Sequence, residues 1–196
     1  MLKKEIIYRE ILSKAIEERV FSFTQLWLSK KFRFSLSTVN NALKPLESIG
    51  AIEKRKRSFA IIDTKKALLY WASERNLEKD ICYATRTDLP VVRAEASMPA
   101  SVIFTAYSGY RMAFNDVPAD YSEVYVYAGK KTIEEIKERF PKKKGPPNIF
   151  VLTADNFLLK RKKFIAPLPQ IFVDLWNLKE WYARDFVNAF MDKVRV

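Results

Sequence analysis

Histidine is absent from this chain of 196 residues, and cysteine occurs once, at Cys82. Catalytic triads and zinc sites that depend on His are therefore excluded, and a single Cys leaves no internal disulfide framework. A lone Cys is typical of a reducing cytoplasm, and we expect Cys82 to be a small buried residue on a strand.

Glycine is also scarce, with four residues, at positions 50, 109, 129 and 145. They are too far apart for the glycine-rich loops that cradle phosphate in nucleotide-binding motifs. Together with the missing His, this spacing argues against an enzyme, and we expect no cofactor and no metal. A metal site built from carboxylates alone stays open.

Long apolar runs are missing as well. No segment approaches the ~20 apolar residues of a membrane helix, and the first ten residues, MLKKEIIYRE, contain no apolar signal core. We therefore expect a cytoplasmic protein with no membrane partner.

Positive charge is in excess, with 35 Lys and Arg against 23 Asp and Glu and a net charge of +12. The first 63 residues hold 13 basic and 7 acidic residues, so half of the excess lies in the first third of the chain. Such an excess of positive charge favours nucleic acid or another anionic surface as a partner. It does not indicate sequence specificity.

The segment from Ser35 to Gly50, SLSTVNNALKPLESIG, has the pattern of an amphipathic helix. Ser35 suits the N-cap and Gly50 the position after the C-cap, while Pro45 should kink the last turn. Apolar residues recur at steps of three and four, at Leu36, Val39, Leu43, Leu46 and Ile49.

The opposite face of this helix carries short polar side chains and one cation, namely Ser37, Thr38, Asn40, Asn41 and Lys44. Hydroxyl and amide groups can read base edges, and a cation can hold phosphate. An ordinary solvent-facing helix would usually carry Glu and Lys here. The set favours a DNA recognition helix, with a plain amphipathic helix as the alternative.

Two helices are expected before this segment. The first runs from Glu5 to Arg19, with apolar residues at helical spacing. The second begins at Ser22 as its cap and ends near Lys31, with Phe23, Leu26 and Trp27 as its buried side. Basic residues then fill the turn before the recognition helix, namely Lys30, Lys31 and Arg33.

A β-hairpin is expected after it. The stretch from Ala51 to Asp63 alternates between apolar and polar residues around a charged centre. Its tip consists of four consecutive cations, Lys54, Arg55, Lys56 and Arg57.

Three helices followed by a basic-tipped hairpin, over Glu5 to Asp63, resemble the winged-helix transcription regulators, a variant of the helix-turn-helix. The stretch LSTVNNALKPLESIGAIEK carries the likeness. The resemblance implies double-stranded DNA as partner, with bases read by the recognition helix and phosphates held by the turn and the hairpin, the "wing".

The next segment is a predicted helix from Thr64 to about Asn76, with one apolar face containing Trp71. Two interpretations are open: a core helix that closes the first domain, or a helix that serves as a connector or as a dimer helix between subunits. A strand is expected within Glu78 to Asp88, and Leu89 to Pro99 is a plausible domain boundary.

Beyond Pro99 the pattern mixes α and β. The fold class is therefore predicted to be α+β, with a winged helix-turn-helix (1–63), a connector helix and strand (64–98), and a small mixed α/β domain (99–196) for dimerisation or partner binding. Helices are expected over Ser101–Asn115, Thr132–Phe140, Ile171–Leu178 and Trp181–Val194, and adjacent strands over Glu123–Ala128 and Asn148–Thr153.

The segments SGYRMAFND, NIFVLT and APLPQIFVDLWNLKEWYARDFVNAFM resemble the C-terminal region of AbiEi-type antitoxins. These are winged-helix repressors of type IV toxin–antitoxin systems. The resemblance implies binding to an inverted repeat, autorepression, and a nucleotidyltransferase-type toxin as partner. Only the DNA-facing positions of the winged helix are carried over from it.

A weaker likeness points to the nucleotidyltransferases themselves. Ser108–Gly109 precedes the acidic residues Asp120 and Glu123, but the dipeptide is reversed, and Tyr125 and Tyr127 stand where further carboxylates would be needed. At best this is a degenerate relative of such an enzyme.

The sequence thus predicts a homodimeric, sequence-specific DNA-binding regulator, most simply a repressor. The alternative is a nucleic-acid-binding or protein-binding module without regulatory activity. A palindromic footprint favours the first, and sequence-blind binding the second. The basic clusters Lys142–Lys144 and Lys160–Lys163 are either solvated loops or additional contacts to phosphate or an acidic partner.

Overall fold

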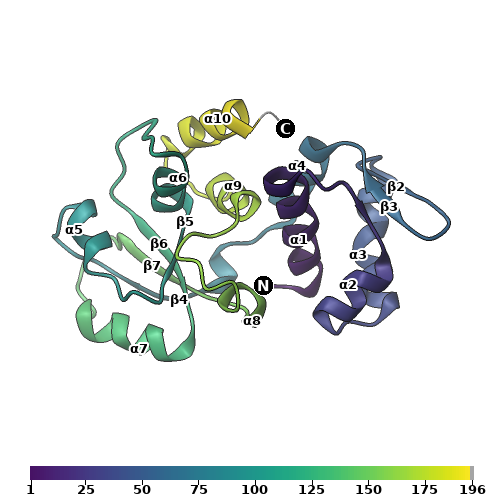
Figure 1. Cartoon of the computed structure of the whole chain (residues 1–196). Helices are drawn as coiled ribbons and strands as arrows, with labels where there is room; N and C mark the ends of the chain where they lie inside the picture. The colour runs from purple at the N-terminus through teal and green to yellow at the C-terminus, as the bar shows by residue number, and fades with distance from the viewer. Residues whose placement is uncertain (195–196) are drawn as a thin grey trace.

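The computed structural model describes residues 1–194, which form a mixed α+β fold with two small sheets (Figure 1). The N-terminal part contains α1 (Lys3–Glu18), β1 (Ser22–Phe23), α2 (Gln25–Phe32), α3 (Leu36–Ser48), β2 (Ile52–Lys54) and β3 (Phe59–Ile61). The helix α4 (Thr64–Glu74) and the 3-10 turn η1 (Glu78–Asp80) follow. The predicted α+β class is confirmed at this level.

The C-terminal part alternates strands and helices. It contains β4 (Ile81–Thr85), α5 (Val91–Ala96), β5 (Ile103–Thr105), α6 (Ala106–Phe114), β6 (Val124–Ala128), α7 (Lys130–Arg139), β7 (Ile149–Thr153), α8 (Asn156–Leu159), α9 (Leu168–Trp176) and α10 (Ala183–Val194). No helix in residues 1–194 has the length and apolar character needed to span a bilayer.

The first sheet has the order β1-β3-β2, and both pairings are antiparallel. Its strands β2 and β3 form the expected hairpin, whose last ladder pair is Lys54 opposite Phe59. The hairpin loop projects from the right-hand end of the molecule in Figure 1, away from the second sheet.

The second sheet has the order β4-β7-β6-β5. The central strands β6 and β7 are adjacent, as the sequence predicted, and run parallel, and β4 and β5 pair antiparallel at the two edges. Alternation along β6 places Tyr125 and Tyr127 in one core with α6, α9 and α10, and Val124 and Val126 in a second core with α5 and α7. Both faces of the sheet are therefore covered by helices (Figure 1).

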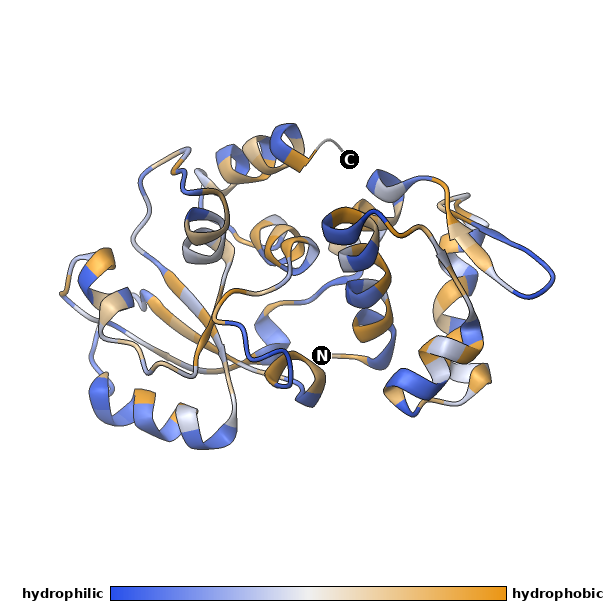
Figure 2. Ribbon diagram, viewed as in Figure 1, coloured by the Kyte–Doolittle hydropathy of each residue, from blue (hydrophilic) through white to orange (hydrophobic). Residues whose placement is uncertain are grey.

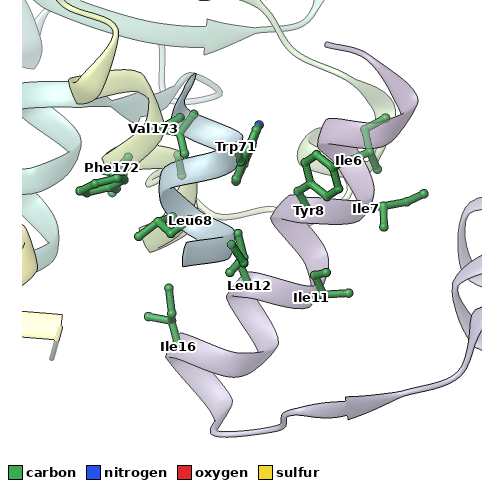
Figure 3. Packing of buried hydrophobic residues seen from close by; sticks show 14 of the residues in the cluster. Ile6, Ile7, Tyr8, Ile11, Leu12, Ile16, Leu68, Trp71, Phe172 and Val173 are labelled. Atoms are coloured by element: carbon green, nitrogen blue, oxygen red, sulfur yellow. The ribbon is translucent and has the colours of Figure 1, made fainter. Parts of the chain in front are cut away.

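One hydrophobic core joins the two parts of the chain. In Figure 3, Leu12 of α1 points toward α4, which carries Leu68 and Trp71, and Phe172 of α9 lies on the other side of Leu68. The side chain of Trp71 is completely buried in this core. The helix α4 is a core helix, but it packs against α9 of the C-terminal part as well as against α1. The idea that its Trp71 face pairs two subunits is wrong, because the chain itself covers that face.

A buried polar network lies beside this core. The Arg75 guanidinium, at the end of α4, donates to Asp174 at 3.3 Å, to Glu5 at 3.2 Å and to Tyr127 at 2.9 Å. Burial alone would lower the pKa of Arg75, but the surrounding acidic groups raise it above its ordinary value. The network fixes α1, α4, β6 and α9 to one another through groups that cannot lose a partner without a large cost in stability.

Several local predictions need correction. The second helix begins after Thr24, whose hydroxyl accepts from the Trp27 amide at 3.0 Å, because Ser22 is drawn into β1 opposite Ala60. Leu26, expected in the core, is 52% exposed, and Phe32 is buried instead.

In the C-terminal part, residues 103–105 form β5 instead of the first turn of a helix, since β6 offers them a partner strand. The helix α7 begins after Gly129, so Thr132 is not its cap. Cys82 lies on β4 as expected but is exposed, with its thiol 3.3 Å from the Val151 carbonyl. The segment 89–99 contains α5 and contributes Ala94 to the second core.

Candidate nucleic-acid interface

The helix α3 has the boundaries that its sequence specifies. The Ser35 hydroxyl accepts from the Thr38 amide at 3.1 Å and caps the first turn. At the other end, Gly50 has φ +69°, and the amides of Gly50 and Ala51 donate to the carbonyls of Glu47 and Leu46. This is the paired hydrogen-bond pattern of a Schellman stop, which needs a residue free to adopt positive φ. The helix continues through Pro45 to Ser48.

The two faces of α3 differ as the pattern predicted, except at its first residue. Val39, Leu43 and Leu46 are buried against α1 and α2, whereas Leu36 is exposed. Among the expected base-reading residues, Ser37, Asn41 and Lys44 are exposed, and Thr38 and Asn40 are half-buried. The exposed face therefore combines short hydrogen-bonding groups with one cation.

The turn between α2 and α3 is held by hydrogen bonds and aromatic packing. Arg33 ends α2 with φ +55°. The Phe34 amide donates to the Ser29 carbonyl at 3.1 Å, and the Ser29 hydroxyl donates to the Phe34 carbonyl at 2.6 Å. The ring of Phe34 stacks on Phe32, and both rings contact Phe157 of α8. The start of α3 is thus fixed to the C-terminal part of the molecule.

Lys30 and Lys31 occupy the last turn of α2, so only Arg33 lies in the turn itself. Lys31 forms an ion pair with Glu10 and lies over the rings of Trp27 and Phe32. Its charge is already compensated within the chain.

The hairpin cations also fall into two groups. Lys54 is the last residue of β2, not part of the tip. Its ammonium lies 2.5 Å from the Glu47 carboxylate and donates to the side-chain amide oxygen of Asn40 on α3 at 3.3 Å. Arg55 pairs with Glu53 at 3.2 Å. Lys56 and Arg57 form the exposed tip, the hydrophilic loop at the right of Figure 2.

The structure therefore brings together a smaller set of available cations than the sequence predicted. The cations near α3 that have no ion pair within the described part of the chain are Lys30, Arg33, Lys44, Lys56 and Arg57. Sequence reasoning missed the role of Glu47, which lies one turn beyond Lys44 on α3 and anchors Lys54. Only the contact of the hairpin with α3 reveals that pairing.

The Ser108–Gly109 dipeptide lies inside α6. Ser108 is completely buried, and a methyl group at Gly109 would come within 3.1 Å of the Phe104 carbonyl and 3.2 Å of Ile171. The glycine thus allows α6 to pack closely against β5 and α9. Tyr125 and Tyr127 are buried in the core of the sheet.

Comparison with known proteins gives no match to this chain, whether to a family model, to a curated protein or to a solved structure.

Proposed function

We propose that this protein is a sequence-specific DNA-binding regulator with a winged helix-turn-helix, in which α3 enters the major groove and the hairpin contacts the backbone. The observation that carries this proposal is the contact between the basic hairpin and α3, the helix whose other side exposes the short polar groups. Lys54 links the two elements through Glu47 and Asn40. Base-reading and phosphate-binding groups are then presented by one surface.

The size of α3 suits this role. Its 13 residues span about 20 Å at the usual helical rise, enough to lie along a major groove about 12 Å wide. Asn41 and Ser37 are separated by one helical turn on the exposed side, so both can face base edges together. Amide and hydroxyl groups supply the donors and acceptors that discriminate bases there.

The cations around α3 would hold the DNA in register. Arg33 lies just before the start of α3, Lys44 in its second half and the hairpin tip beyond its end. Phosphate contacts of this kind position a protein on the duplex without reading sequence. They also make binding fall steeply with salt, because each neutralised phosphate releases condensed counterions.

The proposal includes a role in regulating transcription. A repressor of this type would bind a two-fold operator as a homodimer, and the AbiEi-type resemblance adds a toxin partner for the C-terminal part. A cytoplasmic location accords with such a role. The competing candidate is a nucleic-acid-binding module that ignores sequence.

Selection from duplexes with a randomised centre tests the proposal. The purified full chain is mixed with the library at moderate salt, and bound duplexes are amplified over successive rounds. We expect enrichment of one motif with two related halves. A variant with Asn41 and Ser37 both replaced by Ala should lose that enrichment while still retaining DNA.

Two outcomes would contradict the proposal. Retention of DNA with no enrichment would favour the sequence-blind module. The absence of any DNA retention would remove nucleic acid as the partner.

A further inference from the structure

A second basic site lies on the C-terminal part, where β6 ends and α7 begins. A cavity of about 580 Å³ opens there between the start of α7, the loop before β5 and the turn after α8. Its volume falls within the usual range for sites that hold small molecules, roughly 300–1,000 Å³. The cavity is separate from α3 and the hairpin, none of whose residues lines it.

Four lysines line this cavity, and no acidic side chain among its described lining residues balances their charge. Lys130 and Lys131 belong to the first turn of α7, and Lys162 and Lys163 to the turn after α8. No Asp or Glu is among the described residues that line the cavity, and none of the four lysines has an ion pair within residues 1–194. Like charges gathered without a counterion repel one another, so an anionic ligand would relieve that repulsion.

The backbone at the start of α7 also favours an anionic ligand. Gly129 is the N-cap of α7 and has no side chain to accept from the first amides of the helix. These amides and the helix dipole favour a negative group at the end of α7. The site also lies at the carboxyl ends of two parallel strands, β6 and β7, the edge where open α/β sheets bind ligands.

Much of the remaining lining is apolar. Val102, Ile103, Leu159 and Phe164 contribute to it, and Phe164 is 60% exposed. The Phe164 carbonyl accepts from the Phe104 amide of β5 at 2.8 Å, which fixes this wall against the sheet. An exposed aromatic ring beside a cationic pocket offers a stacking surface for a flat ring.

We propose that this cavity binds a nucleotide, with its phosphate groups at the lysines and the first turn of α7 and its base against Phe164. The proposal goes beyond DNA binding and assigns an effector-type ligand to the C-terminal part. The hydroxyls of Thr132 and Ser101, 2.8 Å apart at the lining of the cavity, are further hydrogen-bonding groups for the ligand.

Calorimetric titration of the full chain, without DNA, tests this site with three probes: ADP, inorganic pyrophosphate and adenosine. We expect ADP and pyrophosphate to compete for one site, ADP to bind more tightly, and adenosine to bind far more weakly than either. Replacing Lys131 and Lys162 with Ala should weaken both phosphate probes at least about tenfold, since charged hydrogen bonds to phosphate are lost. Both side chains are exposed, so the fold should survive.

Two further variants sharpen the result. Phe164→Ala should reduce the affinity for ADP to that of pyrophosphate and leave pyrophosphate unchanged. The control replaces Lys79 and Lys144, two exposed lysines outside the cavity, and should leave all three probes unaffected.

Failure of both phosphate probes to bind, or equal loss in the control variant, would overturn the proposal. Pyrophosphate binding with no gain for ADP would overturn the nucleotide assignment. Displacement of pyrophosphate by duplex DNA, with a matching loss of DNA affinity in the Lys131 and Lys162 variant, would instead assign the lysines to the DNA interface. Because the titrations with ADP, pyrophosphate and adenosine contain no DNA, their result is independent of that of the DNA selection.

Discussion

At the residue scale, substitution of Asn41 can distinguish the proposed reading of bases from a contact to phosphate. Its side chain is exposed near the middle of α3. An amide can donate to and accept from adenine together, and such a pair contributes about 1–3 kcal/mol of discrimination between bases. A phosphate contact made by the same amide would carry no preference for sequence.

We expect Asn41→Ala to weaken binding to the selected operator by about 1–3 kcal/mol and to leave binding to random duplex almost unchanged. Fluorescence anisotropy with both duplexes measures the two affinities. Asn156→Ala, which removes an exposed amide on α8, is the matched control and should change neither. An equal loss on both duplexes would leave Asn41 as a phosphate contact or a structural residue.

Lys54 and Arg55 show that a run of cations in the sequence does not tell which of them are free to bind phosphate. The sequence placed both in a tip of four equivalent cations, but Lys54 bonds to Glu47 and Arg55 to Glu53. Whether a cation is available depends on which carboxylate the fold brings near it. Glu53 is only two residues from Arg55 in the sequence, so that pairing is predictable, whereas Glu47 becomes a neighbour of Lys54 only after the hairpin folds back on α3.

At the element scale, α8 connects the two parts of the molecule. Its Phe157 ring packs edge-on against Phe32, with 4.8 Å between ring centroids. Its N-cap, Asp155, accepts two hydrogen bonds from Arg9 of α1, at 2.7 and 2.9 Å. Burial opposes the charged carboxylate, but the bonds from Arg9 prevail and lower the pKa of Asp155.

The lowered pKa gives this pair a definite pH dependence. Because the folded-state pKa lies below the unfolded value of about 3.9, the pair stabilises the fold above that value. That contribution is lost as pH falls through the lower folded-state pKa. Asp155→Asn removes the charge and keeps an amino acid that caps helices well.

We expect this variant to lose about 1.5–3 kcal/mol of unfolding free energy at pH 7, as for other hydrogen bonds to charged groups. The difference from the original chain should shrink as pH is lowered below about 4, within the range where both remain folded. Urea denaturation at several pH values measures it. A difference independent of pH would show that the ion pair adds nothing to the cap.

The same scale shows which elements could be predicted from the sequence. The ends of α3 were predicted correctly because Ser35 and Gly50 act on the backbone next to them. β1 was missed because its two residues become a strand only by pairing with Ala60 and Phe59, far along the chain. Residues 103–105 were missed for the same reason, since the partner strand β6 decides their conformation.

At the scale of the whole molecule, the hydrophobic core shared by α1, α4 and α9 limits how two copies could associate. Trp71 lies inside this core, and so do Phe186 and Phe190 of α10. Within residues 176–190 of the C-terminal part, the exposed aromatic residues are Trp176, 46% exposed, and Trp181, 80% exposed. The sequence could not show this, since buried and interfacial aromatic faces follow the same helical spacing.

A homodimer should therefore use the surface around Trp181. We expect light scattering to give two chains per operator duplex. In such a dimer the two α3 helices would lie about 34 Å apart, one turn of the duplex. Trp181→Ala should weaken association of the second chain, whereas Leu89→Ala, which removes an exposed apolar side chain elsewhere, should not. A monomer at micromolar concentration, with and without DNA, would contradict the dimer.

The most direct test of the account is the salt dependence of duplex binding by the full chain. Lys56 and Arg57, the exposed hairpin cations with no ion pair in residues 1–194, are replaced with Ala, and Lys79 and Arg93, two exposed cations outside α3 and the hairpin, are replaced with Ala in the matched control. Each lost phosphate contact should reduce the steepness of log affinity against log salt by about 0.9. We predict a slope less steep by roughly one to two units per subunit, with operator preference kept and the control unchanged. An unchanged slope and affinity in the hairpin variant, or an equal change in the control, would contradict the claim that this surface binds DNA.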